Sequence, residues 1–283
     1  MCIRDRIYTL EGNMYKLIAL DIDGTLLNSE KKITNEVFNS IQEAKKSGAK
    51  VVLSTGRPLP GVTPLLDELN LNDDGDYVIC FNGAVVQEVK SKKILSNIEM
   101  CHDDFVLINN LAKENNTHVH INTPTNLIIP EETPNKYTIH EATLNNIDIV
   151  SMNEEDINDD ITFCKIMIID EPEKLEEVLE NIPKDLFDKY TIVRSAPFFL
   201  EFLNKNANKG TALEALCNTI NIPLSKSIAV GDEENDQHMI KMAGLGVAMG
   251  NARDSIKEIA NYVTCSNNEH GVAKVIDKFI LNR

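Results

Sequence analysis

Residues 17–25 read LIALDIDGT, an apolar run that ends in two aspartates, a glycine and a threonine. The run is rich in residues that favour a buried strand, so residues 17–22 are predicted to form one. Successive side chains of an extended segment point to opposite sides, and Asp21 and Asp23 therefore project the same way from the end of this strand. Gly24 lets the chain turn away directly after them. Both carboxylates are thus predicted to face one ligand.

The segments that follow alternate short apolar runs with amphipathic stretches. Five further apolar runs share the strand features: residues 50–55, 76–82, 227–232, 245–249 and 261–265. Helices are predicted between them, and Thr34 is predicted to cap the first. Such alternation is typical of a parallel sheet with helices on both faces. The predicted fold class is α/β, with a Rossmann-like, doubly wound parallel sheet of six strands.

The middle of the chain differs in composition from the two ends. Residues 86–204 contain longer polar stretches and Asn-rich turns, and we interpret them as an inserted α+β domain, called the cap domain below. The Rossmann-like core is assigned to residues 14–85 and 205–283. Residues 1–13 show neither helical nor strand periodicity, and we expect them to be a non-native or disordered leader.

The composition limits the class of partner. The 283 residues include 44 acidic and 28 basic side chains, a formal net charge of −16, with no Lys/Arg-rich run. Nucleic acids and membranes are therefore not expected as partners. No apolar stretch approaches the roughly 18 residues of a membrane helix, and the six cysteines are scattered singly, which favours a reduced, cytoplasmic protein. The expected partner is a small molecule, and both a monomer and a homodimer remain open.

A second acidic motif, GDEEND at residues 231–236, also follows a predicted strand directly. Parallel topology can bring both strand ends to one edge of the sheet, so Asp232 is expected to face Asp21 across a cation. Oxygen ligands of this kind suit Mg²⁺. A solvated acidic turn is the alternative for this motif alone. For DIDGT the alternative is a calcium loop, which is disfavoured because an EF-hand loop has its glycine at the sixth position and not the fourth.

Two further features favour an anionic ligand. Thr55 and Gly56 end the second predicted strand and offer a hydroxyl and backbone amides to an anion. Lys209 precedes a predicted helix and is able to supply the cation that a phosphate group needs. Each feature is weak alone, because an isolated lysine is usually a solvated surface residue.

The motifs DIDGTLL, STGRP, FNGA, NKGT, GDEEND, GVAMGNA and HGVAKVI follow one another in this order along the chain. Together they resemble the motifs of the haloacid dehalogenase superfamily, and specifically those of its Cof-type sugar-phosphate phosphatases. The resemblance spans residues 14–283. It implies a Mg²⁺-dependent phosphatase that hydrolyses small phosphorylated metabolites, above all sugar phosphates, through an aspartyl-phosphate intermediate.

The resemblance also implies a role for each matching residue. Asp21 would attack phosphorus, and Asp23 would act as general acid and then as general base. Mg²⁺ would be held by the Asp21 side chain, the Asp23 backbone carbonyl and the Asp232 side chain. The other implied site residues would hold phosphate oxygens or support those that do: the Ile22 amide, Thr55, Gly56, Lys209 and Asn235 as phosphate ligands, and Asp236 as the residue that orients Lys209.

Two other functions would use the same motifs. A phosphotransferase or phosphomutase would form the same intermediate but return the phosphoryl group to a sugar instead of water. A phosphoaspartate signalling or binding module would accept the group without turnover, and it is disfavoured because both aspartates of DIDGT are intact and a cap is present. The sequence does not identify the metabolite, since selectivity would lie in the cap.

Overall fold

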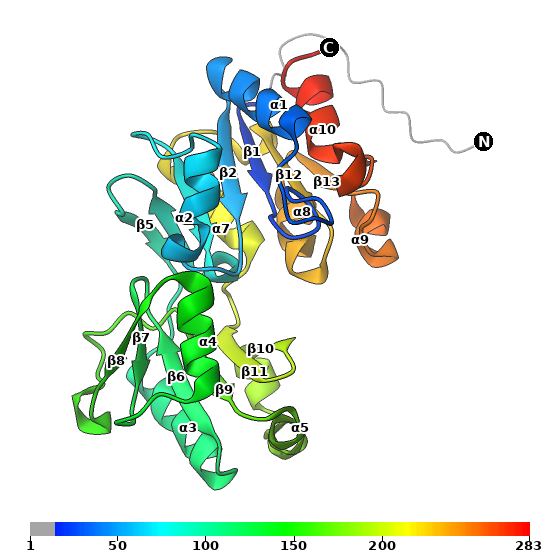
Figure 1. The fold of residues 1–283 in the computed structure, drawn as a ribbon. Coiled ribbons are helices and arrows are strands. Elements are labelled where there is room, and N and C mark those ends of the chain that lie inside the picture. The colour runs from blue at the N-terminus through cyan, green and yellow to red at the C-terminus, as the bar shows by residue number, and fades with distance from the viewer. Residues whose placement is uncertain (1–14) are drawn as a thin grey trace.

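The computed structural model describes residues 15–283, so the leader expected at residues 1–13 lies outside the described part. Two separate sheets organise these residues, one with eight strands and one with six. Figure 1 shows them as two lobes: the core lobe, built from both ends of the chain, and the cap lobe, built from its middle. Within residues 15–283 no helix combines the length and the apolar content that a membrane span requires.

The sheet of the core lobe has the strand order β14-β13-β12-β1-β2-β3-β4-β5. Six of these strands are parallel: β1 (Leu17–Leu20), β2 (Lys50–Ser54), β3 (Tyr77–Cys80), β12 (Ser227–Gly231), β13 (Leu245–Ala248) and β14 (Tyr262–Val263). Each coincides with a predicted strand, and the α/β, doubly wound fold class is confirmed. The chain proceeds from β1 to β2 on one side and later places β12 on the other side of β1. The space between β1 and β12 is therefore the topological switch point, where ligands of such sheets bind.

Two strands of this sheet fall in the stretch that we expected to belong to the cap. β4 (Val85–Glu88) pairs antiparallel with β3, and β5 (Ile94–Asn97) pairs antiparallel with β4. The sheet therefore has eight strands and not six, and it continues past the boundary predicted at residue 86. The strand signal is weak because each strand has only four residues and a polar stretch from Glu88 to Lys93 separates their apolar residues.

Helices cover both faces of the core sheet. They are α1 (Asn35–Lys46), α2 (Leu59–Glu68), α7 (Lys209–Thr219), α8 (Gln237–Met242), α9 (Asp254–Ile259) and α10 (Gly271–Phe279). α1 packs against α10, and α7 packs against α8. α1 connects β1 to β2, and α8 connects β12 to β13, so the two connections run away from the switch point in opposite directions. Because both are right-handed, α1 and α8 lie on opposite faces of the sheet. Thr34 caps α1, as predicted, by accepting a hydrogen bond from the Val37 amide.

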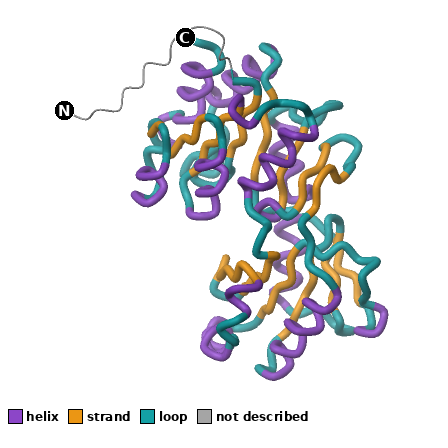
Figure 2. Tube along the Cα trace, turned by 180° about the vertical axis from the view of Figure 1, so that it is seen from behind, coloured by secondary structure: helices purple, strands orange, loops and turns teal. Residues whose placement is uncertain are grey.

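The cap lobe is a six-stranded sheet in the order β10-β11-β9-β6-β7-β8. Its strands are β6 (His118–Asn122), β7 (Asn126–Ile129), β8 (Asp148–Ser151), β9 (Lys165–Ile169), β10 (Tyr190–Ala196) and β11 (Phe199–Asn204). Its helices are α3 (His102–Glu114), α4 (Lys136–Asn145), α5 (Pro172–Asn181) and α6 (Leu186–Lys189). Figure 2 shows the lobes from behind, with loops passing between them.

Strand β9 shows how the two faces of the cap sheet differ. Ile166 and Ile168 join the apolar cluster that α3 and α5 cover, together with Phe105 and Leu175 of those helices. Because side chains alternate along a strand, Lys165 points to the opposite face, where it meets α4. α4 in turn contacts α2 of the core lobe. The face of the cap sheet that carries Lys165, and with it the buried Met167 and Ile169, is therefore the one turned toward the core.

Candidate active site

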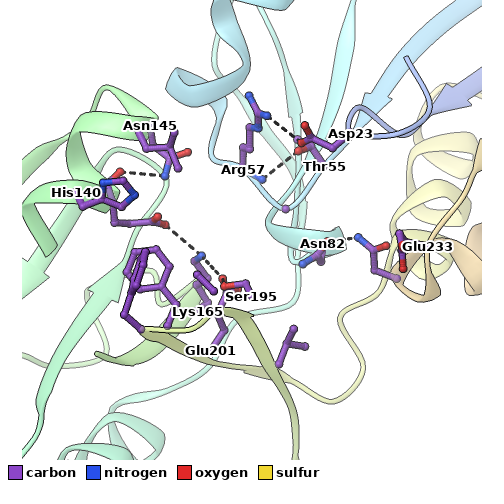
Figure 3. A pocket seen from close by; sticks show the side chains of 18 of the residues that line it. Asp23, Thr55, Arg57, Asn82, His140, Asn145, Lys165, Ser195, Glu201 and Glu233 are labelled. Atoms are coloured by element: carbon purple, nitrogen blue, oxygen red, sulfur yellow. Dashed lines mark hydrogen bonds and ion pairs between the residues drawn. The ribbon is translucent and has the colours of Figure 1, made fainter. Parts of the chain in front are cut away.

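A pocket of about 370 Å³ lies between the two lobes, at the carboxyl ends of the parallel strands. Its core wall contains five of the residues singled out from the sequence: Asp21, Asp23, Thr55, Gly56 and Asn235. Its cap wall is formed by α4 and strands β9, β10 and β11. Figure 3 shows the two walls facing each other, with Asp23, Thr55 and Arg57 on one side and His140, Lys165 and Glu201 on the other.

Asp21 is held at the base of this pocket, directly after β1. Its amide donates to the Val230 carbonyl of β12 over 3.0 Å, which extends the parallel pairing by one residue. The Nζ atom of Lys209, at the start of α7, lies 2.5 Å from Asp21 Oδ1 and 2.7 Å from Asp236 Oδ1. The Lys209 side chain is fully buried, so its ammonium contacts carboxylates and not bulk water. The two segments predicted to supply nucleophile and cation therefore do meet.

Asp232 and Asp236 complete an acidic cluster around Asp21. Their oxygens approach one another and those of Asp21 within 4.8 Å, and within residues 15–283 this is the one group of three or more such side chains close enough to hold a metal ion. Thr25 donates to Asp232 Oδ1 over 2.7 Å. Asp236 Oδ2 accepts from the amides of Asp232 and Glu233. These bonds orient the loop after β12 toward the end of β1.

The acidic cluster carries more negative charge than its one lysine balances. Burial is the largest effect on Asp21 and raises its pKa to about 7, although Lys209 opposes the rise. Burial likewise raises the pKa of Asp232 to about 6. For Lys209, burial alone would lower the pKa, but Asp21 and Asp236 outweigh it and the pKa is raised. The three carboxylates and one ammonium leave two negative charges uncompensated when all are ionised.

This donor set fits Mg²⁺. Uncompensated buried carboxylates are costly, and a divalent cation would balance the two excess charges. Asp21 and Asp232 offer hard oxygen ligands directly after the two strands that flank the switch point, and Mg²⁺ prefers such ligands. The set contains no sulfur or imidazole donor, which would favour zinc instead.

Asp23 lies at the mouth of the pocket, and its side chain is 47% exposed. Lys31 Nζ and an Arg57 guanidinium nitrogen each lie 2.9 Å from one of its carboxylate oxygens. Burial alone would raise the pKa of Asp23, but these two cations outweigh it and hold the pKa below its usual value. Neither Lys31 nor Arg57 was singled out from the sequence as a site residue, although Arg57 belongs to the STGRP motif.

The turns after β2 and β3 form the remaining core wall. Thr55 is buried, and its hydroxyl accepts from the Arg57 amide over 3.1 Å. Asn82 follows β3 in the left-handed conformation, with φ 53°, and its amide donates to the Thr55 carbonyl. Its side chain accepts from Asn235 over 3.1 Å. Asn82 is thus a further pocket residue, and the Asn-Gly pair that follows a strand in FNGA is the signal that points to it.

The side chain of Ile22 is fully buried in the core, so only its backbone is able to face a phosphate group. Gly24 has φ +85°, and a Cβ atom there would lie 2.2 Å from Asp232 Oδ2. A glycine is therefore needed for the close approach of DIDGT to Asp232 as well as for the turn.

Comparison with known proteins places the chain in a family. Residues 18–276 match the model of the haloacid dehalogenase-like hydrolases. A Bacillus subtilis (strain 168) protein named "Putative phosphatase YxeH" is 43% identical over 95% of this chain and 99% of its own length. A second protein of that strain, named 5-amino-6-(5-phospho-D-ribitylamino)uracil phosphatase YcsE, is 36% identical over 94% of this chain and 96% of its own.

Solved structures agree with this placement. The crystal structure of a haloacid dehalogenase-like hydrolase from Bacteroides thetaiotaomicron superimposes with a TM-score of 0.80 at 33% identity, and the match covers 93% of this chain and 99% of that one. The family match, the relatives and this structure all span the core lobe, the cap lobe and the pocket between them. With its two acidic motifs brought together at the switch point, the chain belongs to the haloacid dehalogenase-like hydrolases.

Proposed function

We propose that this protein is a Mg²⁺-dependent phosphatase that hydrolyses small, polyhydroxylated phosphate esters through an aspartyl-phosphate intermediate. The observation that carries the proposal is the position of Asp21, which lines the pocket and lies against the buried Lys209, Asp232 and Asp236. A carboxylate nucleophile, a buried cation and a metal-compatible acidic cluster are the parts that phosphoryl transfer requires.

In the proposed mechanism Asp21 attacks phosphorus while Lys209 neutralises charge on the phosphoryl oxygens. Asp21 and Asp232 would hold Mg²⁺ together with the Asp23 carbonyl, and the bound ion would supply further charge neutralisation. Thr55, the backbone at Ile22 and Gly56, and Asn235 would hold the remaining oxygens. Asp236 orients Lys209 through their 2.7 Å contact.

Asp23 is the proposed proton donor to the leaving alkoxide and the proposed base toward water in the second step. Its ion pairs with Lys31 and Arg57 keep it ionised before substrate enters. We infer that a bound ester draws Arg57 toward the phosphate, which would free Asp23 to take up a proton. Phosphate monoesters need a barrier reduction on the order of 20 kcal/mol, so both charge neutralisation and proton transfer are required.

The proposed substrate class rests on the cap wall, which offers charged and hydroxyl side chains to the organic part of the ester. The YcsE relative supports it, since its name describes a phosphorylated ribityl chain, which is a polyol. A phosphotransferase or phosphomutase would keep the phosphoryl group on an organic acceptor, whereas a phosphatase releases inorganic phosphate.

The test is the release of inorganic phosphate from a panel of sugar and polyol phosphates, with Mg²⁺ and with EDTA. We expect Mg²⁺-dependent release that Asp21→Asn abolishes, because this change removes the nucleophile and a metal ligand while preserving the side-chain shape. Activity of Asp21→Asn within tenfold of wild type would refute the assignment. Transfer to a sugar acceptor without phosphate release would favour the phosphotransferase.

A further inference from the structure

The cap wall of the pocket contains a buried charge cluster that the proposed chemistry does not use. Lys165 of β9 lies between Glu141 of α4 and Glu201 of β11, with Nζ-to-oxygen distances of 3.4 and 3.2 Å. The three residues are 3 to 7% exposed, yet all of them line the pocket. Figure 3 shows Lys165 beside Glu201 and Ser195, across the pocket from Arg57 and Asp23.

The cluster has one carboxylate more than it has cations. Burial alone would lower the pKa of Lys165, but Glu201 and Glu141 outweigh it, so the pKa is raised and the ammonium stays charged. Two carboxylates and one ammonium leave a net charge of minus one on this wall. His140, the other titratable cap residue of the pocket, is exposed.

The hydrogen bonds within the cluster leave acceptors for a ligand. Both ion pairs fall on Oε1 atoms, and Ser195 also donates to Glu201 Oε1, over 2.5 Å. None of these three contacts uses Oε2 of Glu141 or of Glu201. An ionised carboxylate accepts hydrogen bonds and donates none, so its natural partners are hydroxyl or ammonium groups. A carboxylate or a second phosphate on the substrate would instead meet like charge at this wall.

We propose that the Glu141–Lys165–Glu201 cluster selects substrates by charge: it accepts phosphate esters whose organic part carries hydroxyl or amino groups and rejects those that carry a carboxylate or a second phosphate. This inference rests on the proposed function, which places the phosphate group of the substrate at the core wall. It adds a rule about the organic end of the substrate. The side chains Phe198 and Leu144 on the same wall are apolar and offer no compensating cation.

The experiment compares two esters that differ in one group. Sorbitol 6-phosphate and 6-phosphogluconate have the same linear six-carbon chain, with a terminal hydroxymethyl group in the first and a carboxylate in the second. Binding is measured by calorimetry with Mg²⁺ in an Asp23→Asn background, in which alkyl esters turn over slowly. We expect the polyol ester to bind at least about tenfold more tightly than the acid. Equal binding, or no binding of either ester, would overturn the inference.

Variants of the cluster are expected to change this preference in opposite directions, according to the charge that each leaves on the wall. Glu201→Gln and Glu141→Gln each make the wall neutral. Each is therefore expected to reduce the ratio of the two dissociation constants, acid over polyol ester, to about threefold or less. Lys165→Met makes the wall more negative and is expected to widen the ratio. Lys165→Met also leaves two buried carboxylates unpaired and is the variant most exposed to misfolding. The two glutamine variants test the same charge rule without that risk.

The matched control is Glu155→Gln, which removes one negative charge from an exposed turn of the cap outside the pocket. It is expected to leave the ratio unchanged, and an equal effect of Glu155→Gln and Glu201→Gln would attribute the discrimination to overall charge and refute the cluster. Hydrolysis of p-nitrophenyl phosphate by the otherwise unmodified protein tests the proposed function separately. If that hydrolysis occurs and the binding ratio is one, only the charge rule fails.

Discussion

Asp23 is the residue whose two proposed tasks can be separated experimentally. A sugar alkoxide needs a proton as it leaves, whereas the p-nitrophenolate ion is stable without one. With Asp23→Asn, the first step on a sugar phosphate should therefore slow by ~10²- to 10⁴-fold. On p-nitrophenyl phosphate, attack should be nearly unaffected while the second step lacks its base, so p-nitrophenol should appear as a burst in stopped-flow absorbance.

The measurement includes its own control, because the same variant is tested on both substrates. Equal losses on the two esters, without a burst, would mean that Asp23 only positions Arg57, Lys31 or the metal. The acid-base part of the mechanism would then be wrong, while the assignment of Asp21 would be unaffected.

Gly24 tests the link between the DIDGT turn and the metal cluster. Gly24 and Gly48 both have positive φ, +85° and +91°, so alanine should cost about 1 kcal/mol of backbone strain at either position. Only at Gly24 would the new Cβ collide with Asp232, whereas nothing lies within 4 Å at Gly48. We expect Gly24→Ala to weaken Mg²⁺ activation tenfold or more and Gly48→Ala to leave it unchanged, as measured by Mg²⁺ titration of p-nitrophenyl phosphate hydrolysis. Identical Mg²⁺ titration curves for the two variants would mean that the turn at Gly24 does not affect the metal site.

Among the secondary-structure elements, α2 of the core lobe and α4 of the cap lobe contact each other across the two lobes. Gly61 of α2 faces Asn145 of α4, and a Cβ atom at Gly61 would lie 2.5 Å from Asn145 Oδ1. Gly61→Ala removes a glycine from a helix, which in isolation favours the helix by about 1 kcal/mol. It should nevertheless raise KM for a sugar phosphate several-fold, because the cap is held away from the core, while Mg²⁺ activation stays unchanged.

A double-mutant cycle checks that contact. Asn145→Ala removes the side chain that the new methyl group meets, so adding Gly61→Ala to it should raise KM less than Gly61→Ala does in the original protein. Additive effects of the two changes would mean that Gly61 acts within α2 and not through α4.

For the protein as a whole, the raised pKa values of Asp21 and Asp232 link stability to pH and metal. Both carboxyls keep their protons in the metal-free folded state up to about pH 7 and 6, whereas in the unfolded chain they ionise near the usual 3.8. The folded state is therefore favoured at low pH, and this contribution is lost as the pH rises from about 4 through 7. Mg²⁺ binds the ionised carboxylates, so protons compete with it at low pH.

We expect Mg²⁺ to raise the melting temperature by several degrees relative to EDTA at pH 8 and by little at pH 5. Comparing the two conditions at each pH removes the effect of groups such as His120, whose burial lowers its pKa to about 3 and destabilises the fold in acid. Asp232→Asn is the control and should abolish the difference at pH 8. A shift as large at pH 5 as at pH 8 would contradict the proposed ligands.

Most of the core was predictable from the sequence, because its signals are local. Residues 17–25 and 231–236 each combine an apolar strand with acidic residues at its end, and in a parallel sheet the carboxyl ends of neighbouring strands share one edge. The hairpin of β4 and β5 was not predictable in this way, since its two strands have only four residues each and a polar stretch separates their apolar residues. Its position depends on pairing with β3 and not on its own composition.

What depends on tertiary structure is every contact between segments that are distant along the chain and carry no strong local signal. Arg57 and Lys31 acquire a role only because the loops after β1 and β2 bring both to Asp23. Lys165, Glu141 and Glu201 are ordinary charged residues in the sequence, and they form one cluster only because β9, β11 and α4 converge beside the core. Strand periodicity predicts the face of its strand to which a side chain points. Which residue it contacts on that face depends on how the elements and the two lobes pack together.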